Sequence, residues 1–301
     1  MRLDDYDKDI NVEDQRGMSG PGLGGGGGGG GLLLGLLPMI GSRFGCGGVV
    51  VVLLLLAVFG GLGNLGSLFS GGAPTTRQQA GPSTAAQACD TQAAKAACNA
   101  FSSADNTWEK IFAGQQQRFQ APKLVFFGQQ GGQSGCGAAQ SAMGPFYCPT
   151  DRGIYLDTSF FDELTNKYKA GGDFAQYYVI AHEFGHHIQN LLGTSDQVQQ
   201  AQRRAGETEG NALSVRLELQ ADCYAGVWAS MNRQRLDPGD VEEGMRAAQA
   251  IGDDTLQREA QGRVVPDSFT HGTSAQRQAW LRKGMESNGN PAVCDTFSGA
   301  I

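Results

Sequence analysis

Apolar positions at helical spacing are most continuous in the middle of the chain, in 177-YYVIAHEFGHHIQNLLG-193. This spacing predicts one buried amphipathic helix. Asp173 is placed to cap the start of the helix, and Gly193 is placed to end it. The apolar residues that would anchor it in a core are Val179, Ile180, Phe184, Ile188 and Leu191.

The rest of the chain after residue 89 alternates mostly helical patterns with two short apolar runs. The runs Lys123–Phe127 and Ile154–Leu156 predict strands. Residues 253–273 are expected to form a loop. Helices are expected at 90–120, 158–169, 195–206, 208–232 and 237–252, and in a last segment that begins at Ser274. The pattern predicts an α+β fold that is mainly α-helical with a small edge sheet.

The N-terminal third has a different pattern. Residues 1–48 are polar and then glycine-rich, which predicts a disordered segment. Residues 49–70 are apolar and uncharged over roughly 20 positions, the length of a transmembrane helix. Residues 71–88 have the composition of a linker. The soluble domain is therefore expected at 89–301.

The apolar segment begins too late for a typical cleaved signal peptide, so an uncleaved anchor is favoured. Basic residues precede it at Arg2, Lys8, Arg16 and Arg43, and the next, Arg77, follows it. The positive-inside rule then predicts a single-pass protein of the cytoplasmic membrane, with a cytoplasmic N-terminus. The domain would lie outside the cytoplasm, in the periplasm or the extracellular space.

The cysteines agree with an exported domain. Cys46 lies near the apolar segment, and an even set follows it: Cys89, Cys98, Cys136, Cys148, Cys223 and Cys294. In an oxidising compartment these can form disulfides. Spacing favours two local pairs, Cys89–Cys98 and Cys136–Cys148, and this leaves Cys223–Cys294. The alternative is a set of buried free thiols.

Charge excludes one class of partner. The 301-residue chain has a formal net charge of −7 and no basic stretch, so a nucleic-acid partner is not expected.

Candidate chemistry lies within the central predicted helix, as the H-E-x-x-H pattern from His182 to His186. Helix positions four apart share a face, so both histidines can bind one Zn²⁺ ion. Glu183 would then act as general base on a zinc-bound water. The alternative is two core histidines with ordinary hydrogen bonds. A catalytic zinc site needs a third protein ligand.

The predicted helix 208–232 supplies candidates for that ligand. Glu218 and Asp222 in 218-ELQAD-222 are four apart, beside an apolar stripe. Buried carboxylates must be paired or bound to metal. Glu218 is therefore the expected third ligand, and Asp222 the acceptor that orients a zinc-bound histidine. The alternative is a solvated acidic face, and the pair Glu207 and Glu209 is a weaker rival.

Two residues are candidates to stabilise the oxyanion of a tetrahedral intermediate. His271 lies in 270-THGTSAQR-277, in the expected loop. Tyr224 lies on the predicted helix 208–232. Either could donate a hydrogen bond to developing negative charge.

With these residues assigned, the chain resembles a family of bacterial membrane-anchored neutral zinc metallopeptidases. The resemblance covers nearly the whole chain. It is carried by 11-NVEDQRG-17, 144-GPFYCPTD-151, 154-IYLD-157, 181-AHEFGHHIQ-189, 216-RLELQADCYAGVW-228 and 266-PDSFTHGTSAQR-277. The combination of H-E-x-x-H with a downstream glutamate and a nearby aspartate is also similar to the motif pattern of membrane peptidases of the gluzincin class. This resemblance implies a gluzincin-like domain with one zinc on His182, His186 and Glu218, and Glu183 as catalytic base.

The expected function is that of a membrane-anchored zinc endopeptidase acting on an unidentified peptide or protein outside the cytoplasmic membrane. The substrate is expected to lie along an exposed strand edge, at Lys123–Phe127 or Ile154–Leu156. The main alternative is a membrane-tethered scaffold or binding module with a structural zinc. Hydrolysis of a non-peptide amide, as in cell-wall material, is a third interpretation.

Overall fold

The structure is a computed structural model that describes residues 1–17 and 83–301. Its strands are β1 (Val12–Asp14), β2 (Lys123–Phe127), β3 (Gly132–Ser134), β4 (Gly137–Ala139), β5 (Phe146–Cys148) and β6 (Gly153–Asp157). Its helices are α3 (Ala85–Ala88), α4 (Gln92–Gly114), α5 (Ser159–Asn166), α6 (Asp173–Leu191), α7 (Thr194–Gln202), α8 (Glu207–Met231), α9 (Asp240–Ala250), α10 (Asp253–Gln261) and α11 (Ser274–Met285). The predicted α+β fold, mainly helical with a small sheet, is confirmed.

The main sheet has the strand order β1-β2-β6-β5. The strands β1, β2 and β6 are parallel, whereas β5 is antiparallel to β6. One row of the register runs from Val12 through Leu124 and Ile154 to Tyr147. Both predicted strands are therefore interior strands of the described sheet. The expectation that either offers an edge to a substrate is wrong, because β1 and β5 cover their outer sides.

Alternating side chains of the sheet enter two different apolar clusters. Leu124, Phe126, Ile154 and Leu156 join the main core with α4 and α6. Val125, Phe127 and Tyr155 point to the other face, where they pack with Ala139 of β4 and Cys148 of β5. Because both faces are covered, the strands are apolar at nearly every position.

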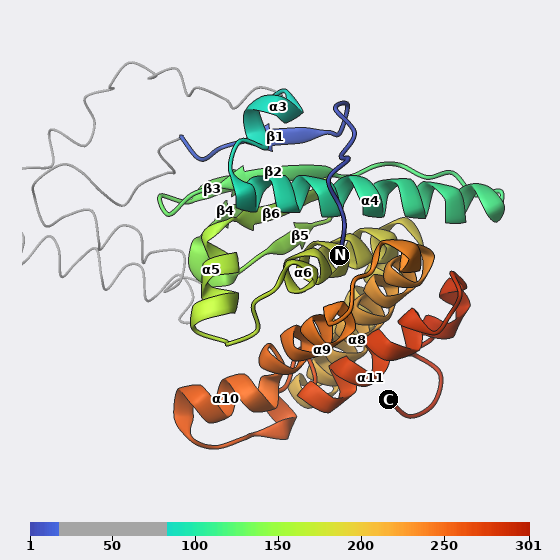
Figure 1. The fold of residues 1–301 in the computed structure, drawn as a ribbon. Helices are drawn as coiled ribbons and strands as arrows, with labels where there is room; N and C mark the ends of the chain where they lie inside the picture. The colour runs from blue at the N-terminus through green and yellow to red at the C-terminus, as the bar shows by residue number, and fades with distance from the viewer. Residues whose placement is uncertain (18–82) are drawn as a thin grey trace, which may run out of the picture. The chain divides into compact units, whose positions relative to one another are not determined.

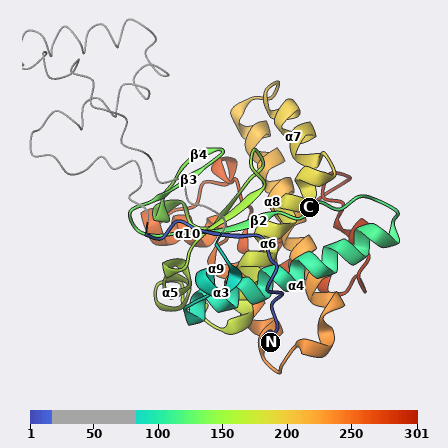
Figure 2. The same cartoon turned by 90° about the horizontal axis from the view of Figure 1, so that it is seen from above.

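Helix α6 is the central element of the helical part. It contacts α4 and the strands β5 and β6 on one side, and α8 and α9 on the other (Figure 1). Helix α8 packs along α11 (Figure 1) and also contacts α7, which Figure 2 shows beside it. The predicted metal-binding motif thus lies where the sheet layer meets the helical layer.

Residues 1–17 are part of this unit. The N–H of Leu124 donates to the carbonyl of Asn11 at 2.9 Å, and the N–H of Asp7 donates to the Ser102 hydroxyl at 2.9 Å. The side chains of Met1, Leu3 and Val12 are buried in the main core. The prediction of disorder over 1–48 is wrong for residues 1–17. Their own apolar content is low, but β2 and the helices supply their hydrogen bonds and core contacts.

The described domain also begins earlier than residue 89. The N–H of Ser83 donates to the carbonyl of Val12 at 3.3 Å, and α3 follows at once. The end of the predicted linker 71–88 is therefore structured. The predicted transmembrane helix 49–70 lies outside the described residues. The helices found within residues 1–17 and 83–301 include no candidate for a membrane span.

All three predicted disulfides are present. They join Cys89 to Cys98, Cys136 to Cys148, and Cys223 to Cys294. The second attaches the β3–β4 hairpin to β5, and the third attaches the chain after α11 to α8. Cys46 lies outside the described residues.

Candidate metal centre

Helix α6 carries the H-E-x-x-H residues from His182 to His186 in its second half. The helix begins after Gly172, whose φ of 135° permits the turn into it, so Asp173 is the first helical residue and not the predicted cap. Gly193 adopts the left-handed conformation, with φ of 75°, just after the helix, as its predicted stop requires. The expected helix is confirmed and is longer at its start.

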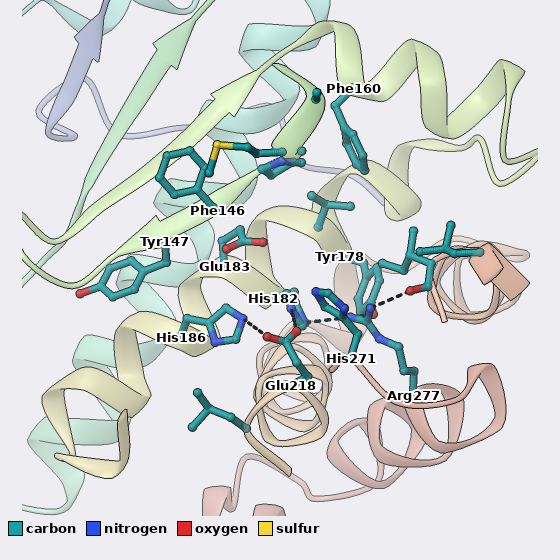
Figure 3. Close-up of a pocket in the computed structure, with 18 of the residues that line it drawn as sticks. Phe146, Tyr147, Phe160, Tyr178, His182, Glu183, His186, Glu218, His271 and Arg277 are labelled. Carbon is teal, nitrogen blue, oxygen red and sulfur yellow. Dashed lines mark hydrogen bonds and ion pairs between the residues drawn. The ribbon is translucent and has the colours of Figure 1, made fainter. Parts of the chain in front are cut away.

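The structure brings the three predicted ligands together. His182 Nε2 lies 3.1 Å from Glu218 Oε2, and His186 Nε2 lies 3.3 Å from Glu218 Oε1. One ligand atom from each residue lies within 4.8 Å of the others. Tetrahedral zinc with ligands at about 2.0–2.2 Å separates these ligand atoms by roughly 3.3–3.6 Å. The donor set therefore fits a zinc ion. Figure 3 shows that the imidazoles of His182 and His186, both on α6, face the carboxylate of Glu218.

The rival carboxylates do not take part. Glu207 and Glu209 lie in the first turn of α8 and are exposed. Glu218 lies three helical turns further on, where α8 crosses α6. Burial acts to raise the pKa of Glu218, but the neighbouring His186 and His182 lower it well below its usual range. The site thus holds an ionised carboxylate beside two imidazoles, which is a suitable arrangement for a cation.

Asp222 occupies the position predicted for the acceptor of a histidine proton. Its side chain is fully buried, and Oδ1 lies 2.8 Å from His182 Nδ1. Tyr178 donates its hydroxyl to the same oxygen at 2.6 Å. The arrangement makes Nδ1 the protonated nitrogen and leaves Nε2 to face the centre of the site.

Arg277 of α11 completes this network and was not predicted from the sequence. Its Nε donates to Asp222 Oδ2 at 2.8 Å, and its Nη2 donates to Oδ1 at 2.9 Å. Burial opposes ionisation of Asp222, but Arg277 and His182 lower the pKa of this carboxyl to about 2. A buried carboxylate facing a histidine needs such a partner. One sequence feature could have identified it: this arginine lies three residues before Trp280, on the apolar side of a predicted helix.

Glu183 lines the same cavity as the ligand set. It is 7% exposed, and Figure 3 shows its carboxylate above the histidines, below Phe146. Burial raises the pKa of Glu183 above its ordinary value, while His186 and His182 act in the opposite direction. A raised pKa brings a carboxylate closer to the range in which it can both accept and return a proton near neutral pH.

The two candidate oxyanion donors have different positions. His271 lines the cavity and lies in the same close-up as His182 and Glu218 (Figure 3). Its Nδ1 is 3.2 Å from Asp253 Oδ1, which leaves Nε2 available. Tyr224 is buried against Trp108, with ring centroids 5.2 Å apart, and does not line the cavity. The expectation for Tyr224 is therefore wrong.

The loop expected at 253–273 contains a helix instead. Asp253 begins α10, and its Oδ2 accepts the backbone N–H groups of Thr270, His271 and Gly272 at 2.8, 2.6 and 3.0 Å. These bonds join both ends of the segment and fix the backbone that carries His271. The sequence pattern missed the helix because it is short and mostly polar.

A cavity of about 910 Å³ surrounds these side chains. Its wall includes β5, the edge strand of the described sheet that lies against α6. Much of the lining is apolar or aromatic, and it includes Met143, Phe146, Tyr147, Phe160, Tyr178 and Leu256. The predicted ligand set thus opens on a space large enough for several side chains of a ligand.

Two curated relatives match most or all of the chain. The chain is 45% identical over 305 residues to the uncharacterized protein YpfJ of Escherichia coli strain K12, and the match covers all of both chains. It is 44% identical over 212 residues to the uncharacterized protein Rv2575 of Mycobacterium tuberculosis strain H37Rv, with 66% of this chain and 68% of that protein covered. No solved structure matches the chain.

The family model described as "Putative neutral zinc metallopeptidase" matches residues 1–297. The match includes residues 1–17, which the structure places in the same unit as the candidate metal centre. The chain therefore belongs to this zinc metallopeptidase family.

Proposed function

We propose that the chain is a zinc-dependent endopeptidase whose zinc is held by His182, His186 and Glu218. The observation that carries this proposal is the position of the three ligand atoms, within 4.8 Å of one another, on a cavity that Glu183 also lines. Zinc bound there supplies a Lewis acid that polarises a carbonyl and lowers the pKa of water. Family membership supports the assignment at the level of a zinc peptidase.

The protein's own side chains then have separate roles. Glu183 accepts a proton from the attacking water and transfers it to the leaving amine. Asp222 holds His182 in the tautomer that presents Nε2, and Arg277 keeps Asp222 ionised. His271 donates a hydrogen bond from Nε2 to the oxyanion, with its ring oriented through Asp253.

A peptide substrate would bind along β5. This strand is the terminal strand of the described sheet on the side of α6, and Phe146 and Tyr147 line the cavity. An extended peptide can pair with such an edge through main-chain hydrogen bonds. The apolar lining favours substrates with large apolar side chains near the cleaved bond.

The openness of the site favours an enzyme over a scaffold. A structural zinc site is closed by protein ligands, whereas a catalytic one keeps a position for water or substrate. The cluster around His182 has three protein donors and lies on a cavity of about 910 Å³. Glu183 beside it has no role in a purely structural site.

We propose that the segment 18–82 attaches this enzyme to the cytoplasmic membrane. The sequence-based topology has one crossing and a cytoplasmic N-terminus, and it would separate residues 1–17 from 83–301. Their shared sheet and core support an even number of crossings, with both parts on the same side. The three disulfides support an oxidising compartment, outside the cytoplasm, for both.

The test compares the full-length, zinc-loaded chain with its Glu183→Gln variant on cell-envelope proteins, by sequencing of new protein N-termini. The full chain is used because residues 1–17 supply a strand. Glu259→Gln, on the exposed side of α10, is the matched control. We expect cleavages that Glu259→Gln retains and Glu183→Gln loses while both bind zinc. Equal cleavage by all three proteins would refute the role of Glu183, and no cleavage by any would favour the scaffold.

A further inference from the structure

The two histidines of the metal centre have different hydrogen-bond partners. His182 faces the carboxylate of Asp222, but His186 faces an amide. His186 Nδ1 lies 2.9 Å from Oε1 of Gln189, one turn further along α6. Gln189 is completely buried. A fully buried amide at a candidate ligand is constrained by the need to satisfy its own donors.

The orientation of the Gln189 amide follows from its other neighbours. Its Nε2 lies 2.6 Å from the carbonyl oxygen of Leu217, which can only accept a hydrogen bond. The NH₂ group must therefore face Leu217, and Oε1 must face His186. Since Oε1 can only accept, His186 carries its proton on Nδ1. Its Nε2 is the nitrogen that faces the site, 3.3 Å from Glu218 Oε1, where a bound zinc would take its lone pair.

A second buried amide continues the chain of hydrogen bonds. Gln189 Nε2 also donates to Oε1 of Gln220 at 3.2 Å. Gln220 Nε2 in turn donates to the carbonyl of Cys294 at 3.0 Å, which fixes the orientation of this amide as well. Cys294 is bonded to Cys223 of α8, three residues after Gln220. The path thus runs from a candidate zinc ligand to a disulfide.

We propose that Gln189 is the positioning residue for His186, and that Gln220 and the Cys223–Cys294 disulfide hold it in place. The inference rests on the proposed zinc site. Gln189 fixes the ring orientation of His186, with Nδ1–H toward Oε1 and Nε2 toward the site. The disulfide keeps the Cys294 carbonyl where Gln220 can reach it, so the crosslink contributes to zinc affinity at a distance.

The first test measures zinc affinity by competition with a chromogenic chelator, for the full-length protein and three variants. Gln189→Leu is expected to weaken zinc binding about 10- to 100-fold, the usual loss for an outer partner of a ligand. Gln220 does not contact His186, so Gln220→Leu is expected to lose less zinc affinity. Gln278→Leu is the matched control, because its amide also donates to a carbonyl, that of Met245, away from the site.

A second measurement separates positioning from a general loss of stability. The measurement is proton NMR of the cobalt-loaded protein. The paramagnetic ion shifts the signals of the Nδ1–H protons of His182 and His186 away from the rest of the spectrum, and these signals report how fast each proton exchanges with solvent. We expect the His186 signal to exchange faster in both Gln189→Leu and Gln220→Leu, while the His182 signal, held by Asp222, stays protected. Equal loss of both signals would indicate general loosening and would overturn the proposal.

The disulfide is tested by replacing both of its cysteines with alanine. The Cys223→Ala/Cys294→Ala protein is expected to bind zinc more weakly than the Cys89→Ala/Cys98→Ala protein, whose bond lies outside this path. Equal affinities would refute the role of the crosslink. Failure of the unmutated protein to bind zinc would refute the proposed function itself. Zinc binding that Gln189→Leu leaves unchanged would refute only this inference.

Discussion

Replacing Gly185 with alanine tests how closely α6 and α8 must approach to build the metal centre. Gly185 is one of the unspecified positions of the H-E-x-x-H pattern. A Cβ added there would lie 2.9 Å from both Cα and the carbonyl oxygen of Ala221, and 3.2 Å from its Cβ. Carbon atoms pack best at about 3.5–4.0 Å. The two helices would therefore have to separate by about 0.5 Å or more.

Two opposing terms set the size of the effect on stability. Overpacking a core costs about 1–3 kcal/mol. Alanine in place of glycine inside a helix raises the free energy of unfolding by about 1 kcal/mol. We therefore expect Gly185→Ala to lower the free energy of unfolding by about 1 kcal/mol. The effect on zinc should be larger, because metal–ligand distances tolerate only about 0.2 Å and Ala221 lies between Glu218 and Asp222.

The assay is urea unfolding of the metal-free protein together with zinc competition. Gly210→Ala is the matched control, because Gly210 is also helical in α8 and an added Cβ would meet no atom within 4 Å. We expect Gly210→Ala to be as stable as the unmutated protein or up to about 1 kcal/mol more stable. Gly185→Ala should bind zinc at least tenfold more weakly. If it unfolds at higher urea than the unmutated protein and binds zinc normally, the argument from close approach is wrong.

Three further predictions concern stability and topology. Zinc at 100 times its Kd should raise the free energy of unfolding by about 2.7 kcal/mol, and a chelator should remove this gain; an unchanged unfolding midpoint would count against a folded-state zinc site. Burial, followed by the nearby Glu109 and Asp7, raises the pKa of Asp105 to about 6, so this carboxyl lowers the stability of the fold progressively as the pH rises from about 3.8 to about 6, and has no effect below about 3.8. Allowing for its partial exposure, Asp105→Asn should gain about 1–2 kcal/mol at pH 8 and almost nothing at pH 3.5 in urea unfolding, and an equal gain at both pH values would refute this cause. Cysteines introduced at the exposed Lys8 and Lys110, in a Cys46→Ser background, should be labelled to the same extent by a membrane-impermeant maleimide in intact cells. Labelling of only one of them would support a single crossing of the membrane.

Local spacing was enough to identify much of the site. His182 and His186 are four residues apart, and so are Glu218 and Asp222, so each pair had to share a face of its helix. A buried carboxylate beside an apolar stripe needs a partner, and the two histidines were the natural candidates. Two of the disulfides were also predictable because their cysteines are close in the chain. These properties depend on short-range geometry that the backbone fixes.

The partners of these residues depended on contacts between distant segments. Arg277 reaches Asp222 from α11, and Gln189 is oriented by a carbonyl of α8. The order of strands placed β1 and β5 outside the two predicted strands, so the edge beside the cavity belongs to β5. Tyr224 turned out to face Trp108. Helical spacing says which residues share a face but not which element that face meets.

The sequence by itself therefore determined the metal-binding motif, the helices that carry it and the α+β class. Only the tertiary structure decided that residues 1–17 belong to the same unit as the site, that an amide holds His186, and that a guanidinium group holds the carboxylate beside His182. The physical reason is that a hydrogen bond needs its partner within about 3 Å in space. Separation along the chain does not fix that distance once the segments belong to different elements.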